Sequence, residues 1–428
     1  MDYKEAINFL FNQLPVYQRE GKAAYKSNLD NTHELDHYFS HPHRSFKTIH
    51  VAGTNGKGSV AHMLASILQH AGYKTGLYTS PHLKDFRERI RINGEMISEE
   101  QVTKFVTDHH EIIEKVQPSF FEMTVAMAFK HFADNQVDIA IIETGLGGRL
   151  DSTNIITPLI SIITNIGLDH TQFLGNSIEK IALEKAGIIK QNIPVIIGES
   201  QEEIKYIFTS RARELQAPIY FADETQRIDY STVNIVGQQV FRLTGETKLP
   251  KELVCDQLGS YQSKNTITAL KAVELLRNPD INIPNRSVYD GMRSISKTTG
   301  LMGRWQILGN NPLIVADTAH NKEGLSQVVD QISNTAWKKL HFILGAVNDK
   351  NVEDLLSLLP RDAKYYFVQA AIPRALDKYE LFSKAMKLGL TGDVYDSVEK
   401  ALLDAQSIAE SCDMIFIGGS TFVVAEVL

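Results

Sequence analysis

The chain has 428 residues and a formal net charge of −7, and its composition is that of a globular protein, 43% hydrophobic and 22% charged. This length exceeds what one hydrophobic core usually organises, so we expect two domains. The acidic balance argues against broad nucleic-acid binding, and no apolar run approaches the roughly 20 residues that span a bilayer. Only two cysteines and no N-terminal export signal predict a cytoplasmic protein without disulfides.

Apolar runs alternate with helical patterns through the first half of the chain. The helical stretches lie near residues 59–71, 99–117, 122–135 and 177–187. The strand-like runs are Phe46 to Ala52, Thr75 to Thr79, Val137 to Thr144, Leu159 to Asn165 and Pro194 to Gly198. This alternation predicts a parallel sheet covered by helices.

A glycine-rich loop joins the first strand to the first helix. It consists of Gly53, Thr54, Asn55, Gly56, Lys57, Gly58 and Ser59, a segment that we call the glycine loop. Glycines let backbone N–H groups turn toward an anion, Lys57 can neutralise phosphate, and the Ser59 hydroxyl can bind magnesium. Gly58 separates Lys57 from Ser59, which argues against a simple GTPase or nucleotide kinase. The loop predicts an enzyme that uses ATP.

Two polar features follow the second strand. Ser80 offers a hydroxyl to a metal or to phosphate, or it simply forms a turn with Pro81. Next come Arg87, Arg89 and Arg91, which form either a basic groove for an anionic substrate or one face of a solvated strand.

The next two strands also end in polar residues, where ligands of parallel sheets bind. Glu143 at the tip of the third strand is a candidate magnesium ligand, with capping of a turn or pairing with Arg149 as the alternative. Asp169 and His170 follow the fourth strand. A lone histidine more often makes an ordinary hydrogen bond. Its interpretation as a ligand depends on the fourth strand lying beside the strand that carries Glu143.

The pattern changes in the middle of the chain. Short β-prone pieces at Ile219 to Phe221, Val233 to Val236 and Gln239 to Thr244 predict a small antiparallel patch, and a helix is expected over residues 261–276. The glycines and hydroxyls of residues 297–303 predict a linker. We therefore expect domains at residues 1–296 and 304–428.

The second domain repeats the alternation of strands and helices. Its strands are expected at Leu313 to Asp317, His341 to Gly345, Lys364 to Val368 and Met414 to Gly418. The overall expectation is an α/β protein, with an N-terminal P-loop domain and a C-terminal Rossmann-like domain. Asp317 and His320 follow the first strand of the second domain, so a second reactant is expected there.

Together these blocks resemble the folylpolyglutamate synthase and dihydrofolate synthase family, within the Mur ligase superfamily. The resemblance spans nearly the whole chain. The residues that carry it are Gly53 to Ser59, Thr79 to His82, Phe121-Glu122, Glu143 to Asn154, Leu168 to His170, Glu184 to Lys190, Tyr261-Gln262 with Asn265, Gly303-Arg304 and Asp317 to Asn321.

The resemblance implies an ATP- and Mg²⁺-dependent ligase that forms an acyl phosphate on a pterin-linked carboxylate, which the amine of L-glutamate then attacks. The acceptor is dihydropteroate, the glutamate tail of tetrahydrofolate, or both. No nucleic acid or membrane partner is expected, and we expect a monomer. A muramyl-peptide-type ligase and a non-catalytic nucleotide-binding switch are the rival interpretations.

The resemblance also implies roles for individual residues. The catalytic set is Lys57, Glu143, His170, Lys185 and His320, and the magnesium ligands are Ser59, Ser80, Glu143, His170 and Lys185, the last if it is carbamylated. Without the resemblance, Lys185 reads as a solvated helix lysine or a phosphate contact. The nucleotide-binding set is the glycine loop with Asn265, Arg304 and Asp317. Contacts to glutamate fall on Arg374 and Ser420, and contacts to the pterin on Phe121, Asp151 and Ser152, although Phe121 could equally pack in the core.

Overall fold

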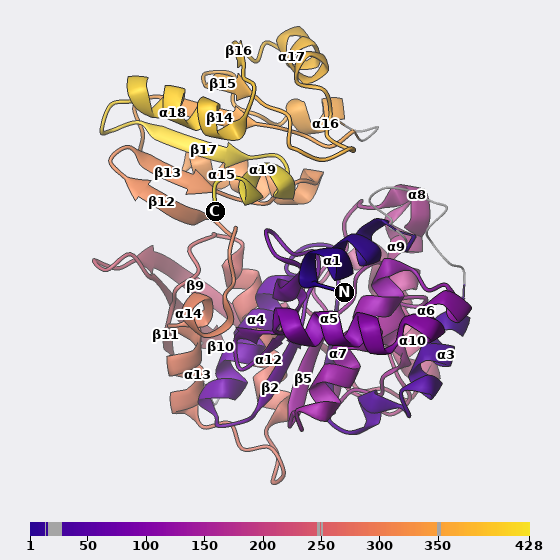
Figure 1. Cartoon of the computed structure of the whole chain (residues 1–428). Helices are drawn as coiled ribbons and strands as arrows, with labels where there is room; N and C mark the ends of the chain where they lie inside the picture. Colours follow the sequence, from indigo (N-terminus) through magenta and orange to yellow (C-terminus); the bar gives the residue numbers. More distant parts are fainter. Residues whose placement is uncertain (13, 16–27, 246–248, 250, 349–351) are drawn as a thin grey trace. The chain divides into compact units, whose positions relative to one another are not determined.

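The computed structural model describes residues 1–12, 14–15, 28–245, 249, 251–348 and 352–428. The chain forms two compact units, coloured along the sequence in Figure 1. Unit 1 comprises Met1–Asp256 and Gln262–Gly300, and unit 2 comprises Gln257–Tyr261 and Leu301–Leu428. Within the described ranges, no helix is long and apolar enough to cross a membrane.

Unit 1 is built on an eight-stranded sheet. The strands are β1 (Lys47–Ala52), β2 (Thr75–Tyr78), β3 (Ile90–Ile92), β4 (Glu95–Met96), β5 (Ile139–Glu143), β6 (Ile160–Ile163), β7 (Val195–Ile197) and β8 (Ile219–Phe221). Their order is β4-β3-β2-β5-β1-β6-β7-β8, and only β3 and β4 run antiparallel to their neighbours. The predicted parallel sheet is confirmed, and its central strands β1, β5 and β6 are almost wholly buried, as a sheet covered on both faces requires.

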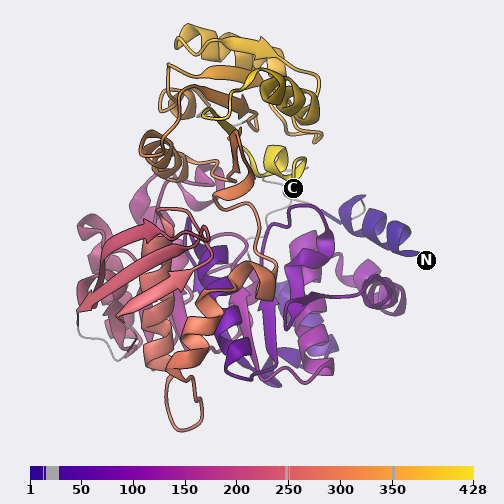
Figure 2. The ribbon, with the colours of Figure 1, turned by 90° about the vertical axis from the view of Figure 1, so that its left-hand side faces the viewer.

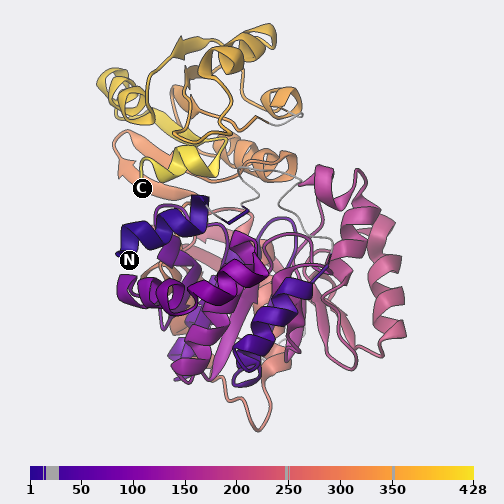
Figure 3. The ribbon, with the colours of Figure 1, turned by 45° about the vertical axis from the view of Figure 1, so that its right-hand side comes forward.

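Helices cover both faces of this sheet. One face carries α1 (Tyr3–Asn12), α3 (Asp30–Tyr38), α5 (Glu99–Asp108), α6 (His110–Val116), α7 (Phe120–Asp134), α8 (Thr171–Leu174), α9 (Ile178–Ala186) and α10 (Glu202–Glu214). Figure 3 shows the purple helices of residues 99–134 against the strands. The helices α4 (Lys57–His70), α12 (Gln262–Leu276), α13 (Asn285–Met292) and α14 (Ile295–Thr299) form a second packed group around α4. Ser98 and Ser119 explain why α5 and α7 begin where they do, because each closes a capping box.

A separate antiparallel sheet contains β9 (Gln226–Val233), β10 (Gln239–Gly245) and β11 (Glu252–Cys255), and Figure 2 shows it in rose and coral. The predicted patch is therefore present, but two of its pieces were misplaced. Ile219–Phe221 is β8, which pairs in parallel with β7 in the large sheet. Residues 234–236 form a turn, because the Asn234 side chain accepts hydrogen bonds from Val236 and Gln238.

Unit 2 is a six-stranded sheet with helices on both faces, which confirms the predicted Rossmann-like class. The strands are β12 (Gln306–Asn310), β13 (Leu313–Ala316), β14 (Leu340–Leu344), β15 (Lys364–Phe367), β16 (Gly392–Val394) and β17 (Met414–Gly418), in the order β12-β13-β17-β14-β15-β16. One face packs on α15 (Lys322–Ser333), α16 (Val352–Leu356) and α17 (Lys378–Lys387). The other packs on α18 (Val398–Ile408) and α19 (Thr421–Ala425).

The segment Gln257–Tyr261 belongs to unit 2 although it lies between two elements of unit 1. The Tyr261 hydroxyl donates to Asp317 Oδ2 over 2.5 Å, and Ser260 N donates to Gln331 Oε1 over 2.7 Å. The chain therefore passes between the units three times. The third passage follows α14, which ends at Gly300 in the left-handed conformation at φ +71°.

Candidate active site

The glycine loop follows β1, which lies between β5 and β6 in the sheet. Two of its glycines stand where no other residue fits. A Cβ on Gly53, whose φ is +145°, would lie 1.9 Å from Thr164 Oγ1. A Cβ on Gly56, whose φ is +84°, would lie 2.2 Å from Asn265 Oδ1 on α12. These glycines let β6 and α12 close directly on the loop backbone.

We predict that Gly53→Ala weakens nucleotide binding and destabilises unit 1 by about 2 kcal/mol or more, because strain and overpacking act together. Thermal unfolding and ADP titration calorimetry would measure both effects. Gly72→Ala is the matched control, since Gly72 also has a positive φ, +91°, but a Cβ there would meet nothing within 4 Å. Equal unfolding temperatures for the two variants would contradict the packing argument.

The segment after β6 holds the glycine loop in place. Thr54 N donates to the Asn165 carbonyl and Asn55 N to Asn165 Oδ1, each over 2.9 Å. Gly167 N donates to Thr54 Oγ1 over 2.9 Å. Gly56 is the N-cap of α4, and no described side chain caps this helix, which leaves its N-terminal N–H groups suited to an anion. Sequence reasoning missed Asn165, whose position at a strand end was the only signal.

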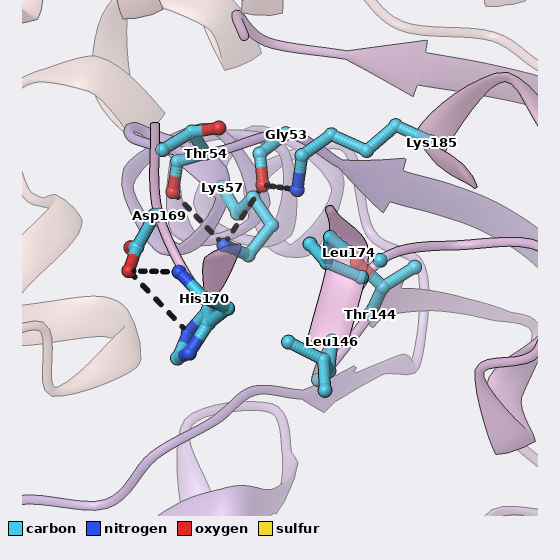
Figure 4. A pocket seen from close by; sticks show the side chains of 11 residues that line it. Gly53, Thr54, Lys57, Thr144, Leu146, Asp169, His170, Leu174 and Lys185 are labelled. Atoms are coloured by element: carbon cyan, nitrogen blue, oxygen red, sulfur yellow. Dashed lines mark hydrogen bonds and ion pairs between the residues drawn. The ribbon is translucent and has the colours of Figure 1, made fainter. Parts of the chain in front are cut away.

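A pocket opens beside the loop (Figure 4). It is lined by Gly53, Thr54, Lys57, Thr144, Gly145, Leu146, Gly147, Asp169, His170, Leu174 and Lys185. Lys57 Nζ donates to the carbonyl oxygens of Gly53 and Thr54, each over 3.1 Å. Lys185 Nζ donates to the same Gly53 oxygen over 2.6 Å. Three of the five predicted catalytic residues, Lys57, His170 and Lys185, therefore line one pocket.

Lys185 lies on α9 and is only 4% exposed, so its interpretation as a solvated helix lysine is wrong. Burial, and after it the nearby Lys57 cation, lower the pKa of its amine to about 7. A lysine with this pKa is a neutral amine in a large fraction of molecules near neutral pH. That form is a nucleophile, which an ordinary surface lysine is not.

Glu143 and Ser80 lie together at the ends of β5 and β2. The Glu143 carboxylate is 3% exposed, and its Oε2 accepts a hydrogen bond from Ser80 N over 3.1 Å. Ser59 is buried in the first turn of α4, where its hydroxyl accepts from Gln262 Nε2 over 3.3 Å. Arg149 forms an ion pair with Glu184 on α9, at 2.8 Å. Among the described side chains, no group of three or more His, Cys, Asp or Glu gathers into a metal cage.

His170 is the N-cap of α8, in the left-handed conformation at φ +51°. Its Nε2 lies 3.9 Å from Asp169 Oδ1, and both residues line the pocket. The expectation that its strand adjoins the Glu143 strand is wrong, because β1 separates β5 from β6. The two strand ends still converge, since Thr144 after β5 lines the same pocket.

Two of the three residues predicted to contact a pterin, Phe121 and Asp151, lie beside Gly145. The Phe121 ring lies 6.1 Å from that of Tyr78, and a Cβ on Gly145 would lie 2.3 Å from the Phe121 ring. Asp151 Oδ2 accepts from Gly145 N and Leu146 N, each over 2.8 Å. Burial raises the pKa of Asp151, which these hydrogen bonds oppose. Ser152 is buried at the start of the short helix η4 (Ser152–Ile155).

The three arginines fit neither of their predicted interpretations. Arg89 is 4% exposed, donates to His82 Nδ1 over 2.8 Å, and lies 5.1 Å from the centre of the Phe120 ring. Arg91 is also buried and donates to the Gly94 carbonyl over 2.9 Å. Arg87 pairs with Asp85 at 2.6 Å. They form neither a basic groove nor a solvated face, because two guanidinium groups are held inside the fold.

In unit 2, Asp317 at the end of β13 accepts hydrogen bonds from three neighbouring segments of the chain. Its carboxylate is 2% exposed and accepts from Tyr261, from Trp305 N over 2.7 Å and from Ala319 N over 2.8 Å. Burial raises its pKa, and the hydrogen bonds and the Arg304 cation oppose that shift. Arg304 donates to the Thr318 hydroxyl and to Gly303 O. His320 Nδ1 lies 3.0 Å from Thr318 O.

The two predicted glutamate contacts lie at other strand ends of unit 2. Ser420 is the buried N-cap of α19, and its Oγ accepts from Phe422 N over 3.2 Å. Arg374 is partly exposed, and its carbonyl accepts from Asn348 N over 2.8 Å. Both follow buried strands, β17 and β15, at the carboxyl side of the sheet, where ligands of such folds bind.

Comparison with known proteins agrees with this geometry. Residues 51–273 match the Mur ligase middle domain, and residues 303–421 match the Mur ligase glutamate ligase domain. The dihydrofolate synthase/folylpolyglutamate synthase of Bacillus subtilis is 32% identical over 437 residues, which cover 99% of this chain and 98% of that protein. The chain belongs to this family. The family and ligase class predicted from the motifs are therefore confirmed.

A second relative, from Haloferax volcanii, is a probable bifunctional folylpolyglutamate synthase/dihydropteroate synthase. It is 32% identical over 433 residues, which cover 100% of this chain but 50% of that protein. This chain thus spans about half the length of that member of the folylpolyglutamate synthase family.

Solved structures of the family share the fold. Escherichia coli FolC in complex with DHPP and ADP aligns with a TM-score of 0.86 and 27% identity, over 100% of this chain and 97% of the other. A bifunctional folylpolyglutamate synthase/dihydrofolate synthase with Mn, AMPPNP and L-glutamate bound aligns with a TM-score of 0.80 and 27% identity, over 94% of each chain.

Proposed function

We propose that this chain uses ATP to add L-glutamate to dihydropteroate, to the glutamate tail of tetrahydrofolate, or to both. The observation that carries the proposal is the pocket beside the glycine loop, in which Lys57, His170 and Lys185 converge. The solved relatives that bind ADP with DHPP, and AMPPNP with Mn and L-glutamate, support the choice of ligands.

The chemistry needs an activated carboxyl group. A carboxylate oxygen of the pterin-linked acid attacks the γ-phosphorus of ATP, and ADP leaves. The amine of glutamate then attacks the acyl phosphate, phosphate leaves with its bridging oxygen, and the amine loses a proton. Lys57 and the N-terminal N–H groups of α4 stabilise the charge that moves between phosphate oxygens.

Magnesium fits the donors on this face of unit 1. Mg²⁺ prefers oxygen ligands, and the candidate ligands include the hydroxyls of Ser59 and Ser80 and the carboxylate of Glu143. Bound magnesium would neutralise phosphate charge. Ser80 N fixes the orientation of Glu143 Oε2. His170 and carbamylated Lys185 complete the proposed set, and both line the pocket.

The remaining assignments are proposed from the resemblance to the folylpolyglutamate synthase and dihydrofolate synthase family. Asn265 contacts the nucleotide next to Gly56, and Arg304 and Asp317 do so in unit 2, where His320 serves the reaction centre. Arg374 and Ser420 bind glutamate, while Phe121, Asp151 and Ser152 bind the pterin. We propose residues 1–296, apart from the segment Gln257–Tyr261 of unit 2, as the ATP-binding domain, 297–303 as the linker and 304–428 as the glutamate ligase domain, in a cytoplasmic monomer.

Phosphate release in the presence of ATP tests this function. We expect release only when a pteroate-type acid and L-glutamate are both present, because the acyl phosphate needs both reactants to turn over. Parallel assays with dihydropteroate and tetrahydrofolate would give the acceptor preference. Phosphate release at the same rate without the pteroate-type acid and without L-glutamate would overturn the proposal. Phosphate release that requires a nucleotide-sugar peptide would favour a muramyl-peptide-type ligase.

A further inference from the structure

A chain of buried hydrogen bonds connects the centre of the sheet to the turn that lines the pocket. His50 lies on β1 and is fully buried, and its Nε2 is 2.9 Å from Thr153 Oγ1. Thr153, also fully buried, donates from Oγ1 to Asp151 Oδ1 over 2.5 Å and from its N to the same oxygen over 3.0 Å. Asp151 Oδ2 in turn accepts from Gly145 N and Leu146 N.

The direction of each bond follows from the donors available. The backbone N–H groups of Gly145, Leu146 and Thr153 can only donate, so the Asp151 carboxylate accepts all three. The Thr153 hydroxyl has one proton, and the charged carboxylate is the stronger acceptor for it. His50 must therefore donate its Nε2 proton to Thr153 Oγ1.

The environment of His50 agrees with this assignment. Burial lowers the pKa of the His50 ring to about 3, with the charge of Lys190 acting in the same direction, so the ring is neutral near pH 7. A neutral ring has one proton, and Nε2 carries it. His50 Nδ1 is then an acceptor, and it has no hydrogen-bond partner in the part of the chain that the structure describes.

The hydrogen bonds from His50 through Thr153 to Asp151, which we call the relay, end at the turn of residues 145–147. This turn has two contacts that matter for the reaction. Gly145, Leu146 and Gly147 line the pocket with Lys57 and Lys185. Farther along the same segment, Arg149 N donates to the Glu184 carbonyl over 2.8 Å, next to Lys185 on α9. A shift of the turn would therefore change the wall of the pocket and the position of Lys185 on α9 together.

We propose that His50 and Thr153 are positioning residues, which orient the Asp151 carboxylate and so hold the turn 145–147 against the reacting groups. The proposal rests on the ligase function proposed above. It assigns to Asp151 a role in the wall of the pocket, in addition to any contact with the pterin. Neither His50 nor Thr153 touches the substrate; both act through Asp151.

Two pairs of variants test the relay. Thr153→Val keeps the shape but removes the hydroxyl, and Thr153→Ser keeps the hydroxyl. His50→Leu removes the donor, and His50→Gln keeps an amide N–H at a similar reach. We expect Thr153→Val and His50→Leu to lower kcat about tenfold or more. The affinity for ADP should stay within about threefold of wild type, because the glycine loop is held independently by Asn165. Thr153→Ser and His50→Gln should restore most of kcat.

Hydrogen exchange at the amides of Gly145 and Leu146 provides a readout that does not depend on catalysis. We expect slow exchange in the wild-type chain and in Thr153→Ser, and clearly faster exchange in Thr153→Val. Wild-type exchange and wild-type kcat in Thr153→Val would overturn the relay. The exchange rates of the wild-type chain and the Thr153 variants can follow this pattern even if the wild-type chain shows no glutamate-dependent phosphate release. In that case the proposed function is wrong, but the positioning of the turn by His50 and Thr153 is still supported. If His50→Leu does not fold, the comparison of Thr153→Val with Thr153→Ser still tests the proposal.

Discussion

Replacing Lys57 by alanine is expected to lower kcat about 10²- to 10³-fold, because the variant loses a cation that stabilises phosphate charge in the transition state. The fold should survive. Lys57 is partly exposed, and in the described part of the chain its Nζ donates to carbonyl oxygens of its own loop. Steady-state phosphate release and a thermal unfolding curve would measure the two effects.

Two further variants separate charge from packing in the Lys57 experiment. Lys57→Met keeps most of the aliphatic stem and should lose as much activity as the alanine variant. Lys180→Ala removes an exposed lysine on α9 and should leave kcat unchanged. Near-normal turnover in Lys57→Ala or in Lys57→Met would refute the assigned role.

Lys185 is expected to be equally sensitive, for a different reason. We propose that its neutral amine attacks CO₂ and loses a proton, which gives a carbamate whose oxygens can bind a metal. Both Lys185→Ala and Lys185→Arg should therefore lower kcat by about 10² or more. If Lys185 were instead a cationic phosphate contact, arginine would preserve much of the activity. An active Lys185→Arg variant would therefore contradict the carbamate.

The pKa of Lys185 also predicts how carbamate formation depends on pH. Burial and the Lys57 cation lower this pKa to about 7, so the amine is mostly protonated below about pH 6 and mostly neutral above about pH 8. Only the neutral amine reacts. At a fixed concentration of dissolved ¹³CO₂, the ¹³C carbamate signal should therefore grow as the pH rises from about 6 to about 8. An unmodified amine in active enzyme would remove the assignment.

Sequence reasoning succeeded where function depends on local order. The glycine loop is such a case, because the strand, the glycines, Lys57 and Ser59 are contiguous and their chemistry follows from their spacing. The buried strands were also predictable, since continuous apolar runs are typical of a sheet covered on both faces. Their ends identified Glu143 and His170 as candidates before any contact was known.

Features that depend on strand order and burial escaped that reasoning. β1 lies between β5 and β6 because of how the helical connections between the strands run across the sheet. No local sequence pattern encodes this strand order. The same applies to Arg89, which looked solvated because a charged residue in a strand usually is, but which is buried against Phe120. His50 looked like one more residue of an apolar strand, and its partner Thr153 lies 103 positions away.

The acyl phosphate can be tested by following one oxygen atom through the reaction. Dihydropteroate or tetrahydrofolate labelled with ¹⁸O in the reacting carboxylate would be converted in the presence of ATP and L-glutamate, and the released phosphate analysed by mass spectrometry. Activation as an acyl phosphate predicts that one ¹⁸O atom passes from the carboxylate to each phosphate released. Glutamate addition that yields unlabelled phosphate would contradict the mechanism proposed for the pocket beside the glycine loop.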